Sequence, residues 1–134
     1  MKRVARIAVV VGIMSAAPLP LLGATEALSE AITVTDGDTV RIGQERIRIL
    51  NIDTPEMGRL AECDAERMLA LVAKDRLTEI LASGPIQIQR DGTDQYGRTL
   101  ATMRVAGSDV GELLIDAHVA VRWAGRRHDW CAGG

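Results

Sequence analysis

One long amphipathic segment divides a series of short strand-like segments, and this order restricts the possible folds more than any other feature of the sequence. The segment spans residues 63–82 and reads CDAERMLALVAKDRLTEILA. Its apolar residues recur at helical spacing, namely Ala65, Met68, Leu69, Val72, Ala73, Leu77, Ile80 and Leu81. Ser83-Gly84-Pro85 then stops the helix. The sequence therefore predicts a single long helix with one apolar face.

Strand-like segments flank this helix on both sides and comprise residues 31–35, 39–42, 45–52, 86–90 and 99–105. Residues 86–90 alternate strictly between apolar and polar side chains, whereas residues 45–52 are apolar on both faces, which indicates a well-buried strand. Ser108 or Asp109 is expected to cap a short helix that follows the last strand. Five strands with a helix between the third and the fourth is the order of an OB-fold. We therefore predict an α+β fold built on a five-stranded OB-fold β-barrel.

The first 24 residues have the character of a signal peptide. Lys2, Arg3 and Arg6 form a charged start, the apolar run IAVVVGIM follows, and small residues and prolines come next. The alternative is an uncleaved membrane anchor, because residues 7–24 are nearly long enough to span a bilayer. Prolines interrupt that stretch and favour the export signal. We expect residues 25–134 to form one domain, periplasmic or secreted, which contacts a membrane only if the N-terminal segment is uncleaved.

The charge balance limits the kind of nucleic-acid binder that the chain could be. Without residues 1–24 the net charge changes from −2 to −5, because three basic and no acidic residues are lost. An acidic domain argues against tight binding to nucleic acid regardless of sequence, which normally requires a basic surface. All remaining basic residues except Lys74 are arginines. The composition still allows an enzyme whose arginines converge on one phosphate.

Two cysteines, Cys63 and Cys131, fit an exported protein with one disulfide bond. The alternative is two free thiols. His128 and Cys131 are also spaced like two metal ligands, but no second close pair completes a zinc site. We predict the disulfide.

The stretch TDGDT, residues 35–39, allows either a hairpin turn or part of a metal site. Asp-Gly between alternating apolar residues is a strong hairpin signal, and on its own the turn is the more frequent structure. An EF-hand is excluded, because Arg41 and Ile47 occupy the positions that require glycine and glutamate. If Asp36 and Gly37 form the turn, Asp38 begins the next strand on the same face as apolar neighbours. Its carboxylate would then point into the mouth of the barrel.

Polar clusters at three strand ends suggest a common site. The clusters are DGDT, RILNIDTPE and DQYGRT, and each alone could be a solvated turn, a helix cap or an exposed charge. The strand ends of one barrel can bring their side chains together. Two aspartates, a glutamate and two arginines form a set suited to phosphoryl transfer: Asp38, Asp53, Glu56, Arg48 and Arg98.

These three blocks, in this order and spacing, resemble the staphylococcal nuclease (thermonuclease) family, from about Ile32 to Trp123. The resemblance implies a calcium-dependent phosphodiesterase on an OB-fold barrel. Such an enzyme cuts DNA and RNA at the P–O5′ bond and leaves 3′-phosphate ends. The partners would be DNA or RNA; we expect a monomer that uses Ca²⁺ and no small-molecule cofactor.

The resemblance also assigns roles to residues at matching positions. Asp38 and Asp53 match the calcium-ligating aspartates, and Thr54 matches the threonine whose carbonyl is a further ligand. Glu56 matches the glutamate assigned as the general base, or as the organiser of the attacking water. Arg48 and Arg98 match the arginines that hold the phosphate. Tyr96 and Trp123 match aromatic residues of the substrate pocket.

Several departures separate this chain from well-known members of the family. The domain is acidic, and Gln95 replaces a basic residue before the tyrosine. The loop after DTPE is short, and both cysteines are additional. A catalytically silent OB-fold module that binds nucleic acid or a protein therefore stands as the alternative function.

Overall fold

The computed structural model describes residues 31–132. The expected signal peptide or anchor over residues 1–24 lies outside this part of the chain, as do residues 25–30 of the expected domain. No helix within residues 31–132 has both the length and the apolar character that a membrane span requires.

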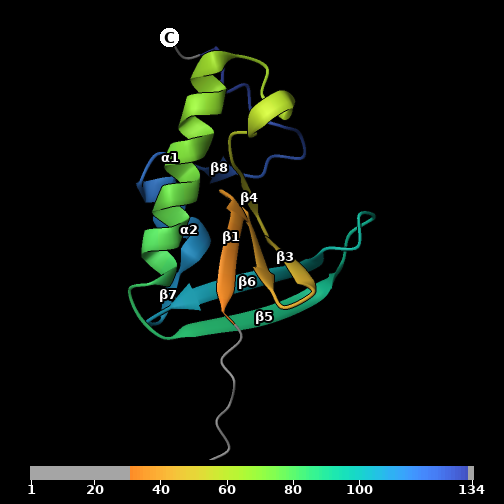
Figure 1. Cartoon of the computed structure of the whole chain (residues 1–134), viewed down its shortest axis with the longest axis vertical. Helices are drawn as coiled ribbons and strands as arrows, with labels where there is room; N and C mark the ends of the chain where they lie inside the picture. Colours follow the sequence, from red (N-terminus) through yellow and green to blue (C-terminus); the bar gives the residue numbers. More distant parts are fainter. Residues whose placement is uncertain (1–30, 133–134) are drawn as a thin grey trace, which may run out of the picture.

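A curled sheet forms the body of the domain (Figure 1). Its strands lie in the order β1 (Ile32–Asp36), β2 (Thr39–Ile42), β3 (Glu45–Ile49), β6 (Thr99–Val105) and β5 (Ile86–Thr93). All neighbouring strands are antiparallel except β3 and β6, which are parallel. The two-residue strand β7 (Ser108–Asp109) pairs with β6. A separate pair joins β4 (Ile52–Asp53) to β8 (Val121–Arg122).

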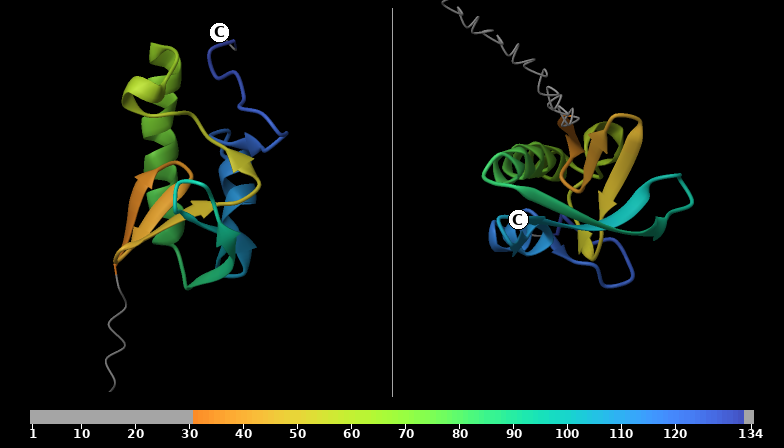
Figure 2. Two further views of the ribbon diagram at one scale, coloured as in Figure 1. Left: turned by 90° about the vertical axis from the view of Figure 1, so that its right-hand side faces the viewer. Right: turned by 90° about the horizontal axis from the view of Figure 1, so that it is seen from below.

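Two helices pack on this sheet (Figure 2). The long helix α1 (Asp64–Leu81) follows β4 and a 3₁₀ turn, η1 (Gly58–Leu60), and the short helix α2 (Val110–Asp116) follows β7. Asp109 caps α2 by accepting a hydrogen bond from the main chain of Glu112 at 3.0 Å. The core between sheet and helices includes Ile47, Leu77 and Leu114, which are fully buried. This architecture confirms the predicted α+β fold of OB type, with the long helix between the third and fourth main strands.

The predicted third strand is not continuous. Residues 45–52 were expected to form one strand, but β3 ends at Ile49 and β4 begins only at Ile52. Asn51 between them has φ = 67°, a left-handed conformation that asparagine tolerates better than most residues. The kink redirects the chain from the sheet toward β8, and it thereby places Asp53 beside the C-terminal segment.

The buried face of α1 also differs from the prediction near the start of the helix. Ala65, Met68 and Val72 are exposed, whereas Glu66 and Ala70 are buried. The first turns of α1 extend past the sheet and lie beside the C-terminal segment instead (Figure 1). A polar loop and the C-terminal segment cover this end of α1. The carboxylate of Glu66 is therefore buried on a side of the helix where the periodicity predicted apolar side chains.

The predicted disulfide is present between Cys63 and Cys131. It joins the N-cap of α1 to the end of the described chain and closes a loop with a sequence separation of 68 residues. In the chain-entropy account, a cross-link of this span stabilises the fold by about 4 kcal/mol, an upper limit.

We expect a variant with both cysteines changed to serine to lose about 2–4 kcal/mol of unfolding free energy. Chemical denaturation of the oxidised protein and of the variant measures the difference, and non-reducing mass spectrometry verifies the bond. Two alkylatable thiols in the purified protein, or equal stability of the two forms, would contradict the prediction.

Candidate active site

The Asp36–Asp38 turn brings its second carboxylate next to β4. Asp36 Oδ1 accepts a hydrogen bond from the main chain of Asp38 at 3.2 Å, as expected for an aspartate that stabilises its own turn. Gly37 packs against two side chains: an added Cβ would lie 2.8 Å from the Cβ of Ala73 and 3.2 Å from that of Thr54. Only glycine allows this close approach. The turn is thereby pressed against the DTPE segment.

Asp38 lies at the rim of the sheet with little exposure. Its side chain is 13% exposed, and its Oδ2 lies 3.3 Å from Nη2 of Arg48. The hydroxyl of Thr39 donates to its Oδ1 at 2.8 Å. Burial raises the pKa of Asp38 to about 6; the charge of Asp36 adds to this shift, while Arg48 opposes it. Protein groups alone therefore do not fully offset the negative charge of the ionised Asp38 carboxylate.

Asp53 and Thr54 follow the kink and are buried, at 5% and 4% exposure. The C-terminal segment holds the aspartate: the main chain of His128 donates to Asp53 Oδ2 at 2.8 Å, and the indole of Trp130 donates to the same oxygen at 3.3 Å. Within residues 31–132, both of these hydrogen bonds end on Oδ2, and Oδ1 of Asp53 accepts none.

Glu56 lies within electrostatic reach of both aspartates. Burial raises its pKa, and the charges of Asp38, Asp53 and Glu66 raise it further, with Arg127 acting in the opposite direction. Glu56 thus interacts electrostatically with three other carboxylates, and the four come from three segments of the chain: the β1–β2 turn, the DTPE segment and α1. The structure brings the three acidic side chains singled out from the sequence, Asp38, Asp53 and Glu56, into one neighbourhood.

The donor atoms of this neighbourhood suit a hard cation. The carboxylates of Asp38 and Asp53 and the main-chain carbonyl of Thr54 are ligands that Ca²⁺ accepts, with water completing the shell. The raised pKa of Asp38 marks a negative charge that a cation would offset. Among residues 31–132, no three His, Cys, Asp or Glu side chains are grouped closely enough to hold a metal. A metal site in this neighbourhood would therefore bind its ion through few protein carboxylates.

The two arginines and two aromatic residues line one groove of about 420 Å³, formed with Leu50, Asn51, Asp94, Gln95 and Leu100. Arg98 donates through Nε to Asp94 Oδ2 at 2.8 Å, and its guanidinium carbon lies 5.6 Å from the ring centre of Tyr96. Tyr96 and Trp123 are 65% and 49% exposed. The groove combines phosphate-binding and stacking groups.

Asp94 organises this side of the groove and was not singled out from the sequence. Its Oδ1 accepts from the main chains of Tyr96 and Arg98, both at 2.9 Å. Partial burial raises the pKa of Asp94, but the hydrogen bonds from Arg98 and Tyr96 outweigh it and leave the pKa below its usual value. The DQYGR loop is therefore held in shape by its own aspartate.

Arg48 connects the groove with the carboxylates. It lies in β3 opposite Thr39 of β2, so its guanidinium lines the groove and also contacts Asp38. Its Nη1 donates to the carbonyl of Ile49 at 2.8 Å and its Nη2 to that of Ile52 at 3.2 Å. The kinked chain after β3 thus fixes the arginine that joins the two halves of the site.

Two further residues support the site, Glu66 and Arg127. Glu66 is 1% exposed and accepts from the main chains of Glu56 at 2.9 Å and Glu62 at 2.7 Å. Arg127 forms a salt bridge with it. The available signal was the N3 position of Glu66 after the N-cap Cys63, where a glutamate often bonds main-chain N–H groups near the helix start. Nothing in the sequence pattern indicated Arg127 as its partner.

Comparison with known proteins gives consistent matches. A family model described as staphylococcal nuclease homologue matches residues 46–129. The succinoglycan biosynthesis protein ExoI of Rhizobium meliloti (strain 1021) is 35% identical over 103 residues, which cover 74% of this chain and 54% of that protein.

Two proteins of Bacillus subtilis (strain 168) match over 92 residues, or 63% of this chain. The endonuclease YncB is 33% identical, and the SPbeta prophage-derived endonuclease YokF is 34% identical. The chain spans 43% and 30% of their lengths, and thus about half or less of each of the three relatives. The family model covers more than half of the chain, on a fold of OB type, and the chain therefore belongs to the staphylococcal nuclease family.

Proposed function

We propose that the protein is a calcium-dependent phosphodiesterase that hydrolyses DNA, RNA or both and leaves 3′-phosphate ends. One observation carries the proposal: Arg48 lines the groove with Arg98 and also pairs with Asp38 of the acidic neighbourhood. A phosphate held in the groove would therefore lie beside the carboxylates. The endonuclease names of two relatives support the same substrate class.

Substrate binding rests on the groove. The guanidinium groups of Arg48 and Arg98 would hold the scissile phosphate, because their paired N–H donors match phosphate oxygens and stabilise charge that grows there during displacement. Tyr96 and Trp123 would stack on neighbouring bases. Since the domain is acidic, binding depends on these few local groups and not on a broad basic surface.

Glu56 is proposed as the general base. Burial and its carboxylate neighbours raise its pKa, which moves the group toward the pH range where it can accept a proton from water. The water oxygen would attack phosphorus, the P–O5′ bond would break, and the leaving oxygen would take up a proton. Asp38, Asp53 and the Thr54 carbonyl would hold Ca²⁺, which offsets the negative charge that the phosphate and carboxylates bring together.

Export is part of the proposal. The disulfide between Cys63 and Cys131 fits an oxidising compartment, and the first 24 residues fit a signal peptide. We propose a periplasmic or secreted location.

A silent OB-fold module is the second candidate function. The name of one relative, ExoI, refers to succinoglycan biosynthesis and not to nucleic acid, and the domain is acidic. Against this alternative, a module without catalysis has no need for Arg48 and Arg98 in one groove together with Glu56 in the adjoining acidic neighbourhood.

End-labelled DNA and RNA oligonucleotides, incubated with the purified chain in calcium, distinguish the two functions. The proposal predicts cleavage to fragments that a polymerase extends only after phosphatase treatment, because their 3′ ends carry phosphate. Retarded but intact oligonucleotides would indicate the silent module. Fragments with free 3′-hydroxyl ends would contradict the proposed bond cleavage.

A further inference from the structure

The C-terminal segment, residues 124–132, touches the acidic neighbourhood at two places. Its main chain at His128 and the indole of Trp130 hold Asp53, as described above. Its Arg127 contacts Glu66 and also lies 3.2 Å from Glu62. The Cys63–Cys131 bond anchors the end of the segment to the start of α1. The contacts with Asp53, the ion pairs of Arg127 and the disulfide bond therefore hold the C-terminal segment against the site.

Glu66 connects the C-terminal segment to the main chain of Glu56. It is the most deeply buried charged residue in the described chain, and its two oxygens accept the main-chain N–H groups of Glu56 and Glu62. A sulfur of the disulfide, in Cys131, lies 4.0 Å from its Oε2. A buried carboxylate remains ionised where hydrogen-bond donors and a counter-charge replace water, and the two main-chain N–H groups are such donors here. Arg127 supplies the counter-charge.

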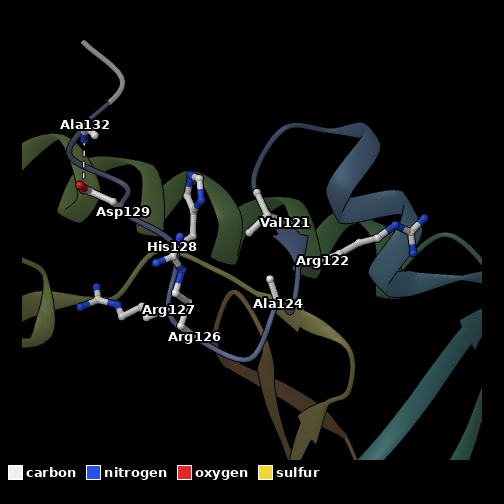
Figure 3. Close-up of a pocket in the computed structure, with 8 residues that line it drawn as sticks. All are labelled: Val121, Arg122, Ala124, Arg126, Arg127, His128, Asp129 and Ala132. Atoms are coloured by element: carbon white, nitrogen blue, oxygen red, sulfur yellow. Dashed lines mark hydrogen bonds between the residues drawn. The ribbon is translucent and has the colours of Figure 1, made fainter.

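The neighbouring arginine gives a natural contrast. Figure 3 shows a pocket along the same segment, with Arg126, Arg127 and Arg122 among its lining residues. Its volume is about 580 Å³. The side chains of Arg127 and Arg122 point in opposite directions, away from the middle of the pocket. Arg122 pairs with Glu112 at 2.6 Å, and Arg126 is exposed. Of the three, only Arg127 reaches the carboxylate that holds the Glu56 main chain.

We propose that Arg127 is a positioning residue of the active site, which pairs with Glu66, holds its carboxylate in place and thereby fixes the main chain of Glu56. The proposal rests on the proposed function, since it assigns a purpose to the geometry of Glu56. A displacement of a reacting group by about 1 Å can lower a rate by about 100-fold. Loss of Arg127 should therefore affect the chemical step more than substrate binding.

The test compares wild type, Arg127→Met, Arg127→Lys and the control Arg126→Met. Arg127→Met should lower kcat by about 10- to 100-fold with KM within about threefold. Arg127→Lys should recover part of the loss, because it keeps a charge beside Glu66. Arg126→Met should behave as wild type. Amide hydrogen exchange, followed by NMR without calcium or substrate, should be faster at Glu56 and Glu62 in Arg127→Met only.

Wild-type kcat in Arg127→Met would overturn the proposal, as would a rise in KM alone or unchanged exchange at Glu56. If Arg127→Met does not fold, Glu66→Gln provides the same test without a buried charge. It offers one acceptor oxygen to three donors, so exchange at Glu56 or Glu62 and kcat should change together. An inactive wild type would instead contradict the proposed function, whereas the exchange data would still report the link from Arg127 to Glu56.

Discussion

Asp38→Asn is expected to remove most of the calcium affinity and to lower turnover by about 100-fold or more, while stabilising the calcium-free fold. Asp38 is one of only two side-chain carboxylates assigned to the ion, so its loss removes much of the charge that would attract the cation. Asparagine keeps the shape and can still accept the hydrogen bond from Thr39. The variant therefore separates the role of the negative charge from the role of the side chain's shape and hydrogen bond.

The effect on stability depends on pH. Burial raises the pKa of Asp38 to about 6 from an ordinary value of 3.8, so the folded protein binds this proton more tightly than the unfolded chain does. Its stability without calcium should fall as pH rises from about 4 to about 6 and stay low above that. A shift of this size corresponds to about 3 kcal/mol. The shift already includes the favourable charge of Arg48, so we expect the variant to gain up to about 3 kcal/mol at pH 8 and nothing below pH 4.

Asp36→Asn is the matched control. Asparagine forms the same turn, so calcium affinity and turnover should remain close to wild type. Calcium titration, turnover and chemical denaturation of both variants give the comparison. Equal losses in the two variants, or a greater loss at Asp36, would show that the wrong carboxylate is assigned to the ion.

Arg48→Lys and Arg98→Lys should each lower turnover by about 100-fold or more, because lysine keeps the charge but loses the paired donors that match phosphate oxygens. The unfolding free energy should change far less for Arg98, whose partners are Asp94 and the exposed ring of Tyr96. Arg48→Lys should cost more stability, because its guanidinium also bonds the carbonyls of Ile49 and Ile52.

Arg76→Lys serves as the control for both substitutions, since Arg76 pairs with Glu79 on the exposed side of α1. Turnover and denaturation midpoints of the three variants provide the comparison. Near-wild-type turnover in either groove variant would mean that its arginine is a surface charge and does not hold the phosphate.

The fold could be predicted because local patterns determine most of it. Alternation, turn residues and helical spacing gave β2 and β6 with their bounds and α1 within one residue at each end. The break at Asn51 was missed, because the run ERIRILNI contains no glycine or proline to interrupt it. The predicted apolar face of α1 was wrong in the first half of the helix, at Ala65, Met68 and Val72, since periodicity reports which residues are apolar and not what covers them.

The site could be predicted only in part. Residues at strand ends and turns carry recognisable motifs, and the structure places Asp38, Asp53 and Glu56 together and Arg48 with Arg98. Their supports come from elsewhere in the chain. Glu66 lies in a helix and pairs with Arg127, 61 positions later, in a segment without strand or helix over residues 123–132. No local pattern signals a contact over that distance.

The most direct measurement of the central claim is turnover of one DNA substrate by the wild-type chain in calcium, after chelation, after calcium is restored, and in magnesium alone. Chelation should abolish cleavage and added calcium should restore it. Magnesium should restore it poorly, because its demand for near-octahedral geometry suits a mixed carboxylate and carbonyl site badly. Undiminished turnover in the chelator, or full turnover in magnesium alone, would contradict a calcium site formed by Asp38, Asp53 and Thr54.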